Sequence, residues 1–164
     1  MTRRRGRVLV TNQATESEVD VRELRAFLER VLEAVGSPPG ELSVLVVDDA
    51  EMRVLNRDHL GRDRTTNVLS FPQDDSGQPG SLMLGDVVLA PTTIERQARN
   101  AGRDPSRERD HALVHAVLHL LGYDHVGTAR ERERMRVRER EVLALLGGGV
   151  RARRGAAARS GSRR

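Results

Sequence analysis

Histidine is the residue type whose spacing in this chain most clearly suggests chemistry. Four of the five histidines fall between His111 and His125, in the segment HALVHAVLHLLGYDH. Residues four positions apart on an α-helix lie on the same face at neighbouring turns. His115 and His119 can therefore direct their imidazole rings toward one metal ion, and His111 continues the same row.

Only two histidines of this row can bind the same ion. A helix rises about 1.5 Å per residue, so His111 and His119 are separated by roughly 12 Å along its axis, which zinc bonds of about 2.0–2.1 Å cannot span. Gly122 permits a left-handed turn through which the chain can double back and present His125. This turn favours His115, His119 and His125 as ligands. His111 is then a neutral surface residue or one that supports a ligand.

Three neutral imidazoles form a ligand set that suits zinc, and a fourth position left open for water is typical of catalytic sites. We therefore predict one Zn²⁺ per chain, used for hydrolysis. Asp124 can either orient a ligand imidazole or cap the turn. Asp86, which follows Gly85 in an expected strand, is a candidate for proton transfer, or alternatively an aspartate held by the backbone at the strand end.

A second kind of zinc enzyme shares this spacing. Certain zinc proteases have the pattern His-x3-His-x2-Gly-x2-His and carry a glutamate directly after the first histidine as general base. In this chain that position is Ala116, which cannot accept a proton. A metalloprotease-like hydrolase therefore remains an alternative, but this chain lacks the general-base glutamate that such an enzyme uses.

The composition excludes several other kinds of site. The 164 residues include no cysteine, which rules out disulfides, thiolate zinc sites and cysteine nucleophiles and fits a reducing compartment. Aromatic residues make up 2% of the chain, too few for a broad base-stacking surface. The chain has no run of about 18 apolar residues, so we expect no membrane span and a cytoplasmic protein.

The apolar pattern places the histidines in an α+β domain. It predicts strands at Arg7 to Asn12, Glu41 to Val47, Asn67 to Pro72 and Ser81 to Ala90. It predicts helices at Glu16 to Val35, Asp48 or Asp49 to His59, Pro91 to Ala101, Pro105 to Leu121 and Thr128 to Leu146. The second strand is almost continuously apolar, which indicates burial on both faces. We expect a small mixed sheet of about four strands packed with about five helices, with the zinc site at the end of a central helix.

A change in composition marks the expected end of this domain. Three consecutive glycines begin at Gly147, and the residues from Gly148 onward contain six arginines and no acid. We predict a single zinc hydrolase domain over residues 1–147 and a disordered Arg-rich tail over residues 148–164.

Three segments carry a family resemblance. They are residues 115–125, which end in LLGYDH, residues 66–72 with the sequence TNVLSFP, and residues 84–88 with the sequence LGDVV. Together they resemble the YbeY endoribonuclease family, the bacterial rRNA maturation factors, and the order of elements fits over roughly residues 7 to 146.

The resemblance implies a zinc-dependent, single-strand-specific endoribonuclease that acts in rRNA maturation and ribosome quality control. The family's metal ligands correspond to His115, His119 and His125, and its partners are rRNA and the small ribosomal subunit. One alternative is the metalloprotease-like hydrolase described above. The other is a non-catalytic ribosome assembly factor in which zinc is structural.

One part of the family pattern is missing from this chain. Where the family has an aromatic residue followed by arginine, the chain has His59 and Leu60. That arginine is thought to hold the RNA phosphate. Arg57, Arg62 or Arg64 could take its place, because guanidinium groups bind phosphate through two hydrogen bonds, or these arginines could be solvated loop charges.

Overall fold

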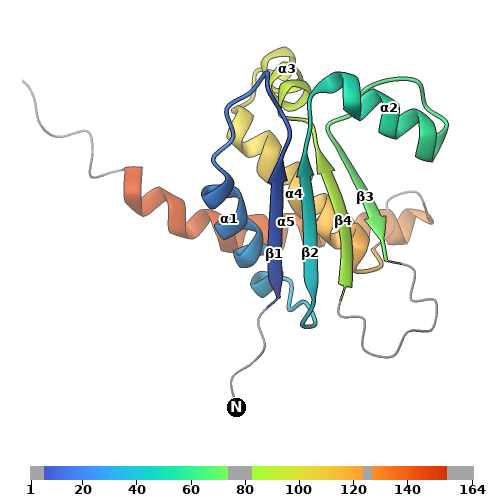
Figure 1. Cartoon of the computed structure of the whole chain (residues 1–164). Coiled ribbons are helices and arrows are strands. Elements are labelled where there is room, and N and C mark those ends of the chain that lie inside the picture. Colours follow the sequence, from blue (N-terminus) through green and yellow to red (C-terminus); the bar gives the residue numbers. More distant parts are fainter. Residues whose placement is uncertain (1–5, 74–82, 124–126, 155–164) are drawn as a thin grey trace, which may run out of the picture.

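The computed structural model describes residues 6–73, 83–123 and 127–154, with side chains described up to Gly147 (Figure 1). Its strands are β1 (Arg7–Asn12), β2 (Glu41–Val46), β3 (Val68–Pro72) and β4 (Met83–Leu89). Its helices are α1 (Val21–Ala34), α2 (Asp49–Leu60), α3 (Pro91–Ala101), α4 (Pro105–Leu120) and α5 (Ala129–Arg154). The predicted α+β class, with a small mixed sheet and helices packed on it, is confirmed.

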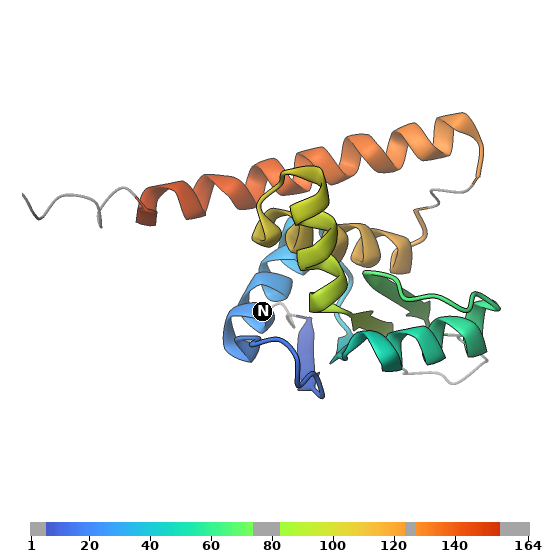
Figure 2. The same cartoon turned by 90° about the horizontal axis from the view of Figure 1, so that it is seen from above.

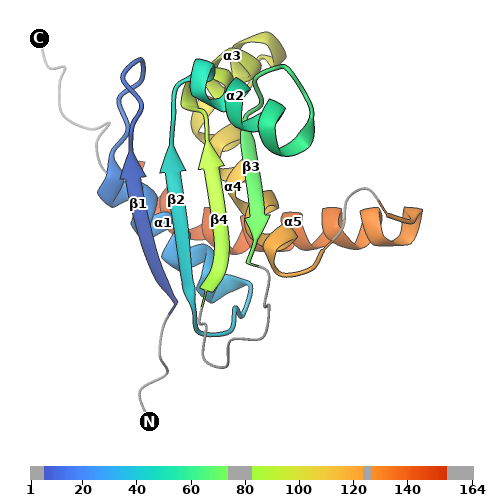
Figure 3. The ribbon, with the colours of Figure 1, turned by 45° about the vertical axis from the view of Figure 1, so that its right-hand side comes forward.

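The four strands form one sheet in the order β1-β2-β4-β3. The first three strands of this order run parallel, and β3 pairs antiparallel with β4 at the edge (Figure 3). The β2 strand alternates between buried residues and half-buried residues. The predicted burial of β2 on both faces is therefore only half right, because the helix on the second face lies over one end of the sheet.

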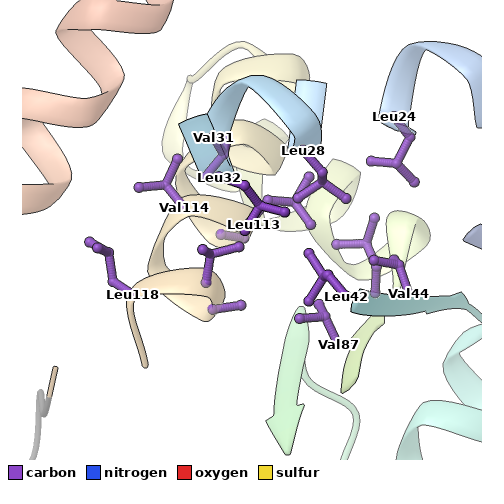
Figure 4. Packing of buried hydrophobic residues seen from close by; sticks show 14 of the residues in the cluster. Leu24, Leu28, Val31, Leu32, Leu42, Val44, Val87, Leu113, Val114 and Leu118 are labelled. Carbon is purple, nitrogen blue, oxygen red and sulfur yellow. The ribbon is translucent and has the colours of Figure 1, made fainter. Parts of the chain in front are cut away.

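The helices cover the two faces of the sheet unequally. Helices α1 and α4 pack on one face, α5 lies across α4, and α2 lies on the opposite face (Figure 2). The main core lies between α1, α4 and the sheet, where Leu28, Leu113 and Leu118 meet Leu42 and Val87 (Figure 4). Because α4 is enclosed between the sheet and α5, it is the central helix that the sequence predicts.

Two helix ends differ from their predicted positions. Helix α1 begins at Val21 rather than Glu16, because the Asp20 side chain accepts hydrogen bonds from the backbone N–H groups of Arg22 and Glu23. Helix α5 continues through the triple glycine to Arg154, so its predicted end at Leu146 is wrong. No helix within the described residues is long and apolar enough to cross a membrane.

Candidate metal centre

The end of α4 has the geometry that Gly122 predicts. Gly122 has a φ of 97°, its N–H donates to the His119 carbonyl over 3.1 Å, and the Tyr123 N–H donates to the Leu118 carbonyl over 3.1 Å. These two bonds form a Schellman motif, in which a left-handed residue ends the helix and reverses the chain. The turn directly follows the two histidines predicted to bind metal.

His119 is held against the edge strand of the sheet. Its Nδ1 atom lies 3.1 Å from the Ser70 hydroxyl on β3. The approach of α4 to the sheet depends on Gly85, which has a φ of 143°. A Cβ atom there would lie 2.7 Å from the Phe71 carbonyl oxygen and 2.8 Å from a methyl carbon of Leu120. Glycine at this position therefore allows the last turn of α4, with His119, to pack on β3 and β4.

His115 is held by a different element. Its Nδ1 atom lies 2.6 Å from Oε1 of Glu139 on α5, and the other carboxylate oxygen lies 3.0 Å from Nε2 of His111. Glu139 is buried, with 5% of its surface exposed. Burial raises the pKa of its carboxyl, but hydrogen bonds and positive charge from His111 and His115 outweigh this effect and lower the pKa to about 2.

Glu139 is a site residue that the sequence patterns above do not identify. It occupies the buried face of α5, together with the apolar residues Met135, Val142 and Leu146. An acid at a position where the helical pattern calls for an apolar residue indicates a buried polar partner, because an unpaired buried charge is costly. This signal was present in the sequence, but it does not say which residue the acid contacts.

His111 contacts Glu139 of α5, whereas His119 contacts Ser70 of β3. The His111 side chain is 53% exposed. The hydrogen bond to Glu139 raises the pKa of His111, and burial opposes this shift. The location fits the sequence interpretation of His111 as a residue that supports a ligand.

The two described candidate ligands, His115 and His119, have side-chain chemistry that suits zinc. His115 and His119 lie four residues apart on α4, and each Nδ1 atom is within hydrogen-bond distance of a second group. An imidazole that carries its proton on Nδ1 presents a lone pair on Nε2, which is a good zinc ligand. The remaining predicted ligand, His125, and the neighbouring Asp124 lie outside the described residues. Within the described part of the chain, no three histidine or acidic side chains form a metal-binding group.

Asp86 does not face these histidines. In β4, Gly85 contacts Leu120 of α4 and Val87 belongs to the core beneath that helix. Asp86 lies between them, and side chains alternate along a strand, so its carboxylate points to the opposite face of the sheet. The structure therefore argues against Asp86 as a proton-transfer group at a metal held by α4.

Helix α2 and the loop after it carry basic residues in different environments. Arg53 donates to both oxygens of Asp63, over 2.8 and 3.2 Å, and Arg57 pairs with Asp58 over 3.1 Å. Arg62 and Arg64 are exposed, and neither forms an ion pair with another described residue. Leu60, at the position of the family arginine, is also exposed, with 51% of its surface accessible.

Comparison with known proteins decides the family. The model of the family described as endoribonuclease YbeY matches residues 9–147. The chain belongs to the YbeY family. Among its relatives in this family, the endoribonuclease YbeY of Halorhodospira halophila is 45% identical, over 82% of this chain and 88% of the relative. The endoribonuclease YbeY of Geobacter sulfurreducens is 40% identical, over 87% and 97% of the two chains.

A solved structure supports the fold. The solution structure of TM1509 from Thermotoga maritima has a TM-score of 0.57 to this chain at 24% sequence identity. The similarity covers 94% of this chain and 100% of the other. At this identity, the comparison establishes the α+β architecture alone.

Proposed function

We propose that the chain is a zinc-dependent, single-strand-specific endoribonuclease that acts in rRNA processing and ribosome maturation. Membership of the YbeY family supports an endoribonuclease activity. The observation that carries the metal assignment is the pair His115 and His119, whose Nδ1 atoms are held by Glu139 and Ser70 at the end of α4. Metal-binding histidines commonly use the second ring nitrogen in this way, which fixes the orientation of the ring.

In the proposed reaction, the metal and the protein side chains have different roles. When bound, zinc would supply Lewis acidity, which polarises a phosphoryl oxygen and makes water a stronger nucleophile. The protein orients the ligand rings through Glu139 and Ser70. Through Glu139, helix α5 is in direct contact with the candidate ligand His115.

A basic groove on the outer face of α5, on the side of this helix away from Glu139, adds a surface that suits RNA. An open groove beside the end of α4 is lined by Tyr123 and by three arginines of α5, Arg130, Arg134 and Arg138, together with Glu133, Val137 and Glu141. The guanidinium of Arg134 lies 5.2 Å from the centre of the Tyr123 ring. Aromatic rings and guanidinium planes stack on unpaired bases, and arginine neutralises phosphates, so this groove favours a single strand.

The protease alternative is weakened by the position of Ala116. Zinc proteases with this spacing require a glutamate there that faces the metal-bound water. Ala116 is 1% exposed and belongs to the main core. The side chain after the first histidine therefore faces the protein interior, where no general base could serve the site.

A parallel cleavage assay tests the proposal. Zinc-loaded full-length protein is incubated with single-stranded RNA, duplex RNA and casein, with and without chelator. We expect cleavage of single-stranded RNA alone, lost on chelation and restored by zinc. His119→Ala should abolish cleavage, and Arg99→Ala on the exposed face of α3 should not.

Each other outcome supports a different function. Zinc-dependent cleavage of casein by the native chain would establish the protease. Zinc bound at full occupancy with no cleavage of any RNA would favour a structural ion in an assembly factor. Ribosomal RNA is added as a final substrate, because the family resemblance suggests it.

A further inference from the structure

Glu139 is a buried acid in an otherwise apolar helix face. Up to Gly147, where side chains are described, the buried residues of α5 are Met135, Glu139, Val142 and Leu146, and the helix packs toward α4 and α1. A carboxylate placed here loses its hydration, and this cost is acceptable only if hydrogen bonds replace the water. An apolar residue would fill the same position without that cost, so packing alone does not account for glutamate.

The two carboxylate oxygens contact two different rings. Oε1 lies 2.6 Å from Nδ1 of His115, and Oε2 lies 3.0 Å from Nε2 of His111. An ionised carboxylate only accepts hydrogen bonds, so both imidazoles donate. A proton on Nδ1 of His115 leaves the lone pair on Nε2, which is the nitrogen that can bind a metal.

We propose that Glu139 is a positioning residue of the metal centre: it selects the Nδ1–H tautomer of His115 and fixes the ring so that Nε2 serves as the ligand. His111 holds the second oxygen and thereby orients the carboxylate. This inference rests on the zinc site proposed above. It assigns a function to two residues, Glu139 and His111, that are themselves outside the predicted ligand set.

The contact also makes the site depend on α5. Glu139 and His115 are 24 residues apart in sequence and belong to different helices. The carboxylate is therefore in place only when α5 is packed on α4. Binding of zinc and docking of α5 should stabilise each other, because both require the same orientation of His115.

The test compares Glu139→Ala and Glu139→Gln with Glu141→Ala in full-length protein. Glu141 lies on the exposed face of the same helix and pairs with Arg138, so its replacement controls for loss of an acid from α5. Zinc affinity is measured by competition with a chromophoric chelator. Removing a carboxylate that supports a metal-binding histidine typically weakens binding by about 10- to 100-fold. We expect this loss for Glu139→Ala, and none for Glu141→Ala.

Glu139→Gln distinguishes positioning from packing. Glutamine keeps the volume of the side chain and one acceptor oxygen for Nδ1–H, so it should recover most of the affinity that alanine loses. The tautomer of His115 is read from long-range ¹H–¹⁵N NMR spectra of the zinc-free protein. We expect a proton on Nδ1 in the native chain and in Glu139→Gln, and a mixture of tautomers in Glu139→Ala.

The possible failures can be separated. Unchanged zinc affinity in Glu139→Ala, together with an unchanged tautomer, would overturn the role of Glu139 even if His115→Ala loses zinc. If the native chain bound no zinc, the proposed metal function would fail. The tautomer measurement on zinc-free protein would still show whether Glu139 controls His115.

Discussion

Individual side chains around α4 divide into predicted ligands and the residues that hold them. His115 and His119 contact Glu139 and Ser70 through Nδ1, and His111 contacts the second oxygen of Glu139. In these three contacts, the histidines belong to α4, and their partners belong to β3 and α5. Their arrangement leads to separate expectations for the ligands and for His111.

The ligands can be identified by metal analysis of alanine variants. The native chain should hold about one zinc, and His115→Ala, His119→Ala and His125→Ala should each lose it, because catalytic zinc is typically held by three protein ligands. His111→Ala should keep its zinc, since His111 only supports the ligand set. Elemental mass spectrometry of purified proteins measures this, and zinc retained at full occupancy in His125→Ala would contradict the assignment.

The titration of His111 has a predictable sign. Its hydrogen bond to Glu139 raises its pKa above the ordinary value of 6.5, despite the opposing effect of burial. A raised pKa means that the folded state holds the proton more tightly than the unfolded state does. The stabilisation is therefore complete below the unfolded pKa and is lost as the pH rises through the folded pKa.

The pKa of His111 and its effect on stability can be measured in zinc-free protein. Titration followed by NMR should place the pKa of His111 above 6.5, and Glu139→Gln should bring it down. The difference in Tm between native protein and His111→Ala should be larger near about pH 5.5 than near about pH 8.5. The effect should be small, because the His111 side chain is half exposed. A difference that grows with increasing pH would be opposite in sign to this expectation.

The packing of α4 on the sheet depends on one glycine of β4. Gly85 has a φ of 143° and lies where a Cβ atom would approach the Phe71 carbonyl oxygen to 2.7 Å. Close to this glycine, α4 also contacts β3, where the Ser70 hydroxyl lies within hydrogen-bond distance of His119. The position of the candidate ligand is thus set by how closely a helix and two strands approach one another.

Gly85→Ala should therefore affect both stability and zinc binding. A side chain at a positive φ costs about 1–3 kcal/mol, and the close contacts add to this cost. Gly36→Ala is the matched control, since Gly36 has a φ of 66° but a Cβ atom added there would meet nothing within 4 Å. Urea unfolding and chelator competition should show both variants destabilised, with zinc affinity reduced only for Gly85→Ala. Equal zinc affinity in the two variants would mean that the packing of Gly85 does not control His119.

At the scale of the whole molecule, the described residues form a layered structure whose last element is the long helix α5. Helix α5 lies across α4 and extends past the rest of the domain (Figure 2). Its last buried side chain among the described residues is Leu146. The arginines from Arg151 onward come after Leu146 in the sequence, and we expect their contribution to be charge.

Truncation after Gly148 tests what that charge does. The Tm, zinc content and cleavage pattern should be nearly unchanged, because the core and the predicted ligands are retained. Each phosphate contact on a single strand contributes about 0.7 to the slope of log affinity against log salt. With two to four arginines engaged, truncation should flatten this slope by roughly 1.4 to 2.8 units. The test is to measure the RNA affinity of full-length and truncated protein at several salt concentrations. Identical slopes for the two proteins would mean that the tail has no role in binding RNA.

Local sequence determined the features that depend on neighbours along the chain. The shared helix face of His115 and His119 and the left-handed turn at Gly122 follow from backbone hydrogen bonds between residues a few positions apart. The order of strands and helices follows from the local apolar pattern. The continuation of α5 beyond Gly147 is the exception, because glycine lowers helix propensity without forbidding a helix.

Tertiary packing alone decided which side chains meet. Glu139 reaches His115 across 24 residues, Ser70 reaches His119 across 49 residues, and Asp86 falls on the face of the sheet away from both histidines. These relations depend on strand order and on the docking of α5, which no local pattern encodes. The spacing of the histidines thus predicted the candidate ligands, whereas the fold decided which residues hold their rings.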